Sequence, residues 1–187
     1  AGEQTSAGVD VLVDRTLALF GASPAALSPN GDGRADTTSF SFTLAKPALV
    51  AVRVLASDGS VVAMPYTGQL GAGPQAVPWN GGGVAGRVAD GTYTAQVTAI
   101  DNLGDIVQQV TLVIDTVAPA LTLVSGLELR LNLSEQALVT VTVDGRMQTV
   151  TAGPGEFQLP AQPTPPAAVS AVATDAAGNS SATVAWP

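Results

Sequence analysis

The residues with the clearest potential for chemistry lie in the stretch 30–36, which reads "NGDGRAD". Asn30, Asp32 and Asp36 stand at the first, third and seventh positions of a loop, and the backbone carbonyl of Arg34 stands at the fifth. Calcium takes about six to eight oxygen ligands from side chains and backbone, and this spacing can wrap a short chain around one ion. The glycines permit the tight backbone angles that such a wrap requires. We therefore interpret the stretch as a candidate structural calcium site.

The same residue types also form turns without any metal. Asn and Asp side chains accept hydrogen bonds from backbone N–H groups two residues on, so Asn30 and Asp32 could shape a turn that leads into a strand at Thr37. The stretch contains only two carboxylates, and a calcium ion there would need further ligands from elsewhere in the fold. The sequence leaves the calcium and turn interpretations open.

Composition excludes most kinds of catalytic site. The 187 residues include no cysteine and no histidine, which removes disulfides, thiolate nucleophiles, Cys/His zinc sites and every triad with an imidazole base. Lys46 is the only lysine, and the fifteen acidic residues are scattered singly along the chain. No pair of them has a spacing that indicates acid–base catalysis. We predict that the chain is not an enzyme and that calcium is its one candidate cofactor.

Charge and hydropathy limit the partners. Seven basic residues face fifteen acidic ones, for a formal net charge of -8, which disfavours binding to the phosphate backbone of nucleic acid. No apolar run approaches the roughly 20 residues that a membrane-spanning helix needs. The chain begins at Ala1 without a methionine, as expected of a matured or excised segment whose signal peptide has been removed.

Short alternating strands account for the hydrophobic pattern. "TSFSFTL" places Phe40, Phe42 and Leu44 on one face, and "ALVTVTVDGRMQTV" at 137–150 forms a hairpin around an Asp-Gly turn. No segment shows a sustained period of 3.6 residues, and turn residues recur every 8–12 residues or so. The sequence therefore predicts an all-β protein built as a β-sandwich.

An internal repeat divides the chain. The segment 95–115 aligns with 170–186: each has an alternating strand, a turn that starts at Asp101 or Asp175, and a final strand. Two copies of one closing hairpin imply two domains of one class. Asp115, at the start of the linker between them, is interpreted as a turn former or as a ligand of an interdomain ion. We predict two tandem β-sandwich domains, at 23–117 and 118–187.

Residues 1–22 are interpreted as a strand and linker from a preceding domain. The stretch 9–19 is similar to 110–121, with an apolar strand, an aspartate and a second apolar strand. One interpretation is a chain cut within a longer protein. The other is a donor strand that completes the sheet of another molecule, a mode of peptide recognition known as β-augmentation. Its contacting residues would be Val9, Val11, Val13, Leu17 and Leu19.

Several motifs together resemble a known family. The stretch 27–115 is similar to the immunoglobulin-like domain of the flagellar hook-capping family, a module of many secreted and surface-anchored bacterial proteins. The residues that carry the resemblance are Ser28-Pro29-Asn30-Gly31-Asp32-Gly33, Asp58-Gly59, Trp79-Asn80-Gly81 and Asp90-Gly91-Thr92-Tyr93. The family usually has Asp where this chain has Asn80. Residues 118–187 resemble bacterial immunoglobulin-like repeats that end in "TDAAGNSS".

The resemblance implies two tandem immunoglobulin-like β-sandwiches preceded by an orphan N-terminal strand. It also implies a non-catalytic structural role outside the bacterial cell. We expect a stalk, spacer or adhesion segment of a secreted or surface-displayed protein, whose partners are neighbouring domains or copies of itself. One alternative is a surface fibre subunit joined by the N-terminal donor strand. A second is a polysaccharide-binding accessory of a secreted enzyme, which would use Trp79 or Trp186; we expect Trp79 to be a core residue instead.

Overall fold

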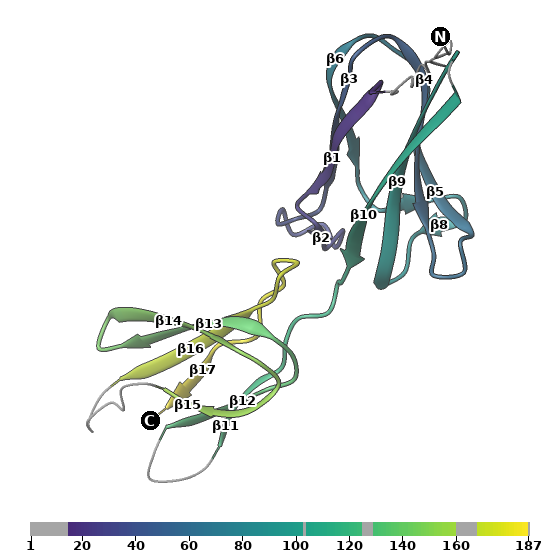
Figure 1. The fold of residues 1–187 in the computed structure, drawn as a ribbon. Coiled ribbons are helices and arrows are strands. Elements are labelled where there is room, and N and C mark those ends of the chain that lie inside the picture. The colour runs from purple at the N-terminus through teal and green to yellow at the C-terminus, as the bar shows by residue number, and fades with distance from the viewer. Residues whose placement is uncertain (1–14, 103, 125–128, 160–167, 187) are drawn as a thin grey trace, which may run out of the picture.

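The protein is built entirely from β-strands in the residues that the computed structural model describes, which are 15–102, 104–124, 129–159 and 168–186. Figure 1 shows two units arranged end to end, each with its own sheets, joined by the segment that follows β10. Each unit has a separate cluster of buried apolar side chains. The expected all-β fold class is confirmed. Within the described ranges, no helix has the length and apolarity that crossing a membrane requires.

The first unit packs a three-stranded sheet against a five-stranded one. The three-stranded sheet has the order β1-β3-β6, and the five-stranded sheet has the order β2-β10-β9-β4-β5. Neighbours are antiparallel except β2 and β10, which are parallel. The strand bounds are β1 (Leu17–Ser23), β2 (Ala26–Leu27), β3 (Thr38–Leu44), β4 (Ala48–Leu55), β5 (Val61–Leu70), β6 (Gly73–Trp79), β9 (Gly91–Asp101) and β10 (Gly104–Ile114), with a small hairpin of β7 (Gly82–Gly83) and β8 (Gly86–Arg87).

Strand alternation places the core of the first unit as the sequence predicts. Phe40, Phe42 and Leu44 of β3 are buried, because the period of two sends every second side chain to the same face. Phe40 stacks on Trp79, with ring centroids 6.1 Å apart. Trp79 is 6% exposed, and its indole N–H donates to the carbonyl oxygen of Gly82 at 2.8 Å. The interpretation of Trp79 as a core residue is confirmed.

The second unit repeats this strand order. Its sheets run β11-β12-β15 and β14-β13-β16-β17. β11 and β12 therefore occupy the places of β1 and β3, and β13, β16 and β17 occupy those of β4, β9 and β10. The bounds are β11 (Leu121–Val124), β12 (Arg130–Leu133), β13 (Ala137–Val143), β14 (Arg146–Ala152), β15 (Gly155–Gln158), β16 (Val169–Thr174) and β17 (Val184–Trp186).

The described end of the N-terminal segment belongs to the first unit. Strand β1 pairs antiparallel with β3, with Leu17 opposite Leu44, and so covers an edge of β3 whose backbone groups would otherwise be unpaired. Leu17 is 4% exposed, whereas Leu19 is 79% exposed. The predicted boundary after residue 22 falls inside β1. Val9, Val11 and Val13 lie outside the described residues.

Removal of the Phe40 ring tests the core of the first unit. We predict that Phe40→Ala destabilises this unit by about 3–5 kcal/mol, because the buried ring leaves a cavity against Trp79. Urea unfolding followed by tryptophan fluorescence measures the change. Leu19→Ala, a loss of side-chain volume at an exposed position of β1, serves as the control and should change stability by no more than about 0.5 kcal/mol. Equal effects of the two substitutions would contradict the assignment of Phe40 to the core.

Candidate functional site

The loop between β2 and β3 is closed by the carboxylate of Asp36. The backbone N–H of Gly31 donates to Asp36 Oδ1 at 2.6 Å, and that of Gly33 donates to Asp36 Oδ2 at 2.7 Å. Both glycines have positive φ angles, 88° and 86°, which a residue with a Cβ adopts only under strain. The glycine spacing therefore lets two N–H groups point at one carboxylate.

Two Asx turns complete the loop. The N–H of Asp32 donates to Asn30 Oδ1 at 2.9 Å, and the N–H of Arg34 donates to Asp32 Oδ1 at 2.8 Å. Each side chain thus accepts from the backbone two residues on, which is the pattern of the turn interpretation. The hydrogen bonds explain the loop without an ion. Calcium binding by Asn30, Asp32, Asp36 and the Arg34 carbonyl stays a prediction.

This loop also contacts the second unit. The hydroxyl of Ser28 donates to Asn179 Oδ1 at 2.5 Å, and Asn30 Nδ2 donates to the same oxygen at 3.2 Å. The guanidinium of Arg34 donates to Ser180 Oγ at 3.2 Å. Ser28 and Asn179 are both buried. The turn 175–180, between β16 and β17, therefore packs against the loop 28–36 of the first unit, and we call this contact the junction.

Asn179 has partners on every side of the junction. Its Nδ2 donates to the backbone carbonyl of Asp115 and to Asp175 Oδ2, each at 2.8 Å. Its backbone N–H donates to Asp175 Oδ1 at 2.9 Å. The amide thus bonds to the loop, to the linker and to its own turn. The sequence places Asp175 and Asn179 in a turn, but turn residue types alone do not show that this turn is buried.

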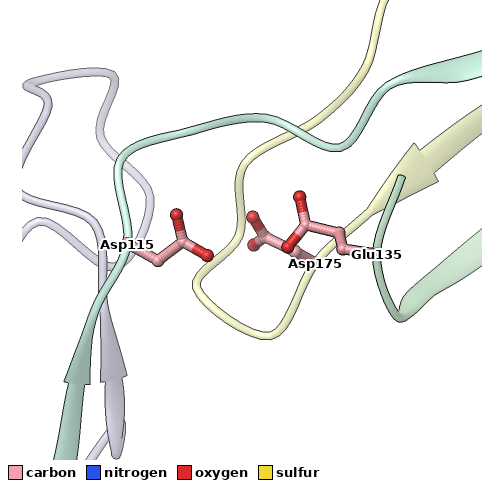
Figure 2. A group of neighbouring side chains, drawn as sticks. All are labelled: Asp115, Glu135 and Asp175. Carbon is pink, nitrogen blue, oxygen red and sulfur yellow. The ribbon is translucent and has the colours of Figure 1, made fainter. Parts of the chain in front are cut away.

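Three carboxylates gather beside Asn179. Asp115 follows β10, Glu135 lies in the turn between β12 and β13, and Asp175 follows β16. One carboxylate oxygen from each residue lies within 4.8 Å of one from each of the other two. Figure 2 shows the three side chains converging from separate segments of the chain. They supply three of the roughly six to eight oxygens that calcium takes. Asp115 Oδ1 also accepts from the N–H of Val117 at 3.1 Å, as the turn interpretation of Asp115 expects.

The cluster is electrostatically unfavourable for Glu135. Burial, and then the negative charges of Asp115 and Asp175, raise the pKa of the Glu135 carboxyl above its ordinary value. Each of these causes disfavours the ionised form. Ionised Glu135 therefore reduces the stability of the folded chain. The three carboxylates also line an open pocket of about 350 Å³ between the two units.

The first unit has an ion pair at the place that corresponds to Glu135 and Asp175 in the second unit. The turn between β3 and β4 carries Lys46, and β9 ends at Asp101; Lys46 Nζ lies 2.8 Å from Asp101 Oδ2. The same two places in the second unit hold Glu135 and Asp175. A cation–anion pair in one unit is thus replaced by two carboxylates in the other. The repeat in the sequence pairs Asp101 with Asp175 but does not bring Glu135 or Asp115 to them.

One family model matches part of the first unit. Residues 25–103 match the family model of the FlgD Ig-like domain. The resemblance predicted for 27–115 is therefore confirmed over this range, which covers less than half of the chain. No curated protein sequence matches the chain.

Solved structures are similar only at a distance. The fibronectin(III)-like modules of Clostridium thermocellum CbhA have a TM-score of 0.49 and 14% identity, covering 89% of this chain and 91% of that one. The Salmonella enterica SafA pilin in complex with the SafB chaperone has a TM-score of 0.41 and 16% identity, covering 90% and 96%. The E. coli chaperone DraB has a TM-score of 0.38 and 16% identity, covering 90% and 98%. At these values the similarities carry no functional argument.

Neutralising Glu135 should stabilise the chain at neutral pH. Because the pKa of Glu135 is raised in the folded state, its ionised form destabilises the fold above that pKa. We predict that Glu135→Gln adds about 0.2–1 kcal/mol to the free energy of unfolding, the range for solvent-screened charges. As the pH falls through the raised pKa the advantage declines, and below the ordinary value of 4.5 it disappears.

Urea unfolding at neutral and at acidic pH measures this difference. The control is Glu156→Gln, which neutralises an exposed glutamate on β15 and should leave stability almost unchanged at both pH values. A Glu135→Gln variant less stable than the parent at neutral pH would contradict the prediction.

Truncating Asp36 tests the turn interpretation of the loop. Asp36→Ala removes the acceptor of two backbone N–H groups, and we predict a loss of about 1–3 kcal/mol, since hydrogen bonds to a charged group are the strong ones. Asp32→Ala removes one such acceptor and should have a smaller effect. Thermal unfolding of both variants and the parent, in calcium and in EDTA, measures the losses. Equal losses in the two buffers are expected; a loss seen only in calcium would indicate a bound ion instead.

Proposed function

We propose that this chain is a non-catalytic structural segment of an extracellular bacterial protein, acting as a stalk or spacer that holds other domains at a fixed separation. The observation that carries the proposal is the junction, where two β-sandwich units meet end to end through a buried hydrogen bond between Ser28 and Asn179. Such a contact is useful in a protein that must keep its domains in line. The match to the FlgD Ig-like domain supports the assignment to this class of protein, and we propose that the second unit is a further Ig-like domain.

Other features agree with a spacer. The formal charge of -8 on 187 residues favours solubility over association with the anionic surfaces of cells and nucleic acids. Trp79, one of the two side chains on which polysaccharide binding would depend, is buried in the first core. Leu17, part of the donor strand of the fibre hypothesis, is already packed in the same core. Both observations favour the spacer over the two alternatives.

The molar mass and shape of the purified chain test the proposal. Light scattering should give the mass of a monomer in calcium and in EDTA, and small-angle X-ray scattering should give an elongated particle. Large assemblies that disappear when residues 1–14 are removed would instead support the fibre subunit, because that variant keeps β1 intact. Saturable binding to polysaccharide would also overturn the spacer proposal.

A further inference from the structure

We infer that the loop 28–36 is a docking surface whose partner is the turn 175–180 of the same chain, and that Asn179 is the residue that locks the two units in one orientation. The inference rests on the proposed spacer function and deepens it, because it says which contact makes the spacer rigid. Domains joined by a linker move relative to each other unless their interface is extensive or specifically held. Here a buried polar network holds it.

The chemistry of the amide fits this role better than any other side chain of its size. Asn179 Oδ1 accepts from Ser28 and Asn30 on the first unit. Its Nδ2 donates to the Asp115 carbonyl and to Asp175. A carboxylate has the same shape but no donor. Since Asn179 is only 3% exposed, water does not readily replace a partner that is lost, and each lost partner weakens the hydrogen bonding of a buried group.

The first unit provides an internal comparison. In the repeat, its closing turn starts at Asp101 where the second unit has Asp175, and Asp105 stands where the second unit has Asn179. Asp105 is exposed, whereas Asn179 is buried against the first unit. The same hairpin turn thus carries an acid where it faces solvent and an amide where it faces another unit. This difference is expected if the amide is there to serve the contact.

The linker is hydrogen-bonded to one unit at each end, which limits how far the two units can move relative to each other. Thr116 donates its backbone N–H to Asp90 Oδ2 on the first unit at 3.0 Å. Ala120 donates its N–H to Ser134 Oγ on the second unit at 2.9 Å, and Pro119 between them is buried. Only a few residues separate these two hydrogen-bonded positions, and the ring of Pro119 fixes the φ angle of one of those residues. The docked turn then fixes the remaining rotation.

Packing at the junction is close as well as polar. Gly178 has a φ angle of 88°, and a Cβ placed on it would lie 3.6 Å from the Cβ of Arg34 and 3.8 Å from that of Ala35. The turn therefore approaches the loop to van der Waals distance. Arg34 adds a hydrogen bond to Ser180 beyond this contact. The contact between loop and turn therefore extends beyond Asn179 to its neighbour Ser180.

Distances between the units test the inference directly. The chain has no cysteine, so Gln69→Cys on β5 and Gln148→Cys on β14, both exposed, place one spin label on each unit of the full chain. Pulsed electron–electron double resonance should give a single narrow distribution of distances between the two labels. Asn179→Asp and Ser28→Ala, each added to the labelled pair, should replace it with a broad one. Asn132→Asp, the same change at an exposed position of β12, should leave it narrow.

The two variants approach the contact from opposite sides. Asn179→Asp also changes the turn within the second unit, and circular dichroism and thermal unfolding report whether that unit still folds. Ser28→Ala leaves the second unit intact, so its effect on the distribution decides the matter if the first variant fails to fold. A narrow distribution in Ser28→Ala and in a folded Asn179→Asp would overturn the inference, as would a broad one in the unsubstituted pair.

Failure of the inference and failure of the proposed function are distinguishable. A monomeric chain with a broad distance distribution would remain a spacer, but a flexible one. A chain that forms fibres or binds polysaccharide while its distribution stays narrow and Asn179-dependent would keep the locked junction and lose the spacer role.

Discussion

The hydrogen bonds of one buried amide, that of Asn179, hold together parts of this chain that lie 151 residues apart in sequence. The oxygen of the amide faces Ser28 and its nitrogen faces the linker and Asp175. Buried polar groups need partners, so each of these bonds restricts where the others can lie. The loop that supplies Ser28 must keep its shape for the contact to form. Asp36 provides that shape by binding the N–H groups of Gly31 and Gly33.

The two units show how one strand order can carry different electrostatics. In the first unit, Lys46 lies against Asp101 where β4 begins and β9 ends. In the second, Glu135 and Asp175 occupy these places, and the linker adds Asp115. The strand order determines which positions lie close together, and the same order forms with either charge at those positions. The result is an ion pair at the far end of the first unit and a group of like charges at the junction.

The cores differ in a way that matches the low aromatic content of the chain. In the first unit Phe20, Phe40, Phe42 and Trp79 form a chain of ring contacts with centroid distances of 6.1–6.4 Å. The fully buried residues of the second unit are leucine, valine and alanine, with Phe157 as the one aromatic residue packed against them among the described residues. Aromatic side chains bury more surface each than aliphatic ones, and the second unit has fewer strands around its core. The second unit is therefore expected to have the smaller core of the two.

The sequence by itself determined the strands, their inward faces and the turn residues, because these depend on spacings of two to five residues along the chain. The alternation in β3 and the Asx pattern at Asn30 and Asp32 are local in this sense. Tertiary structure decided which edge β1 pairs with, since a free strand edge accepts any extended segment within reach. It also decided that Glu135 meets Asp175, because β13 and β16 pair in the second unit. The docking of the two units buries Asn179, because it brings Ser28 and the linker to a turn far away in sequence.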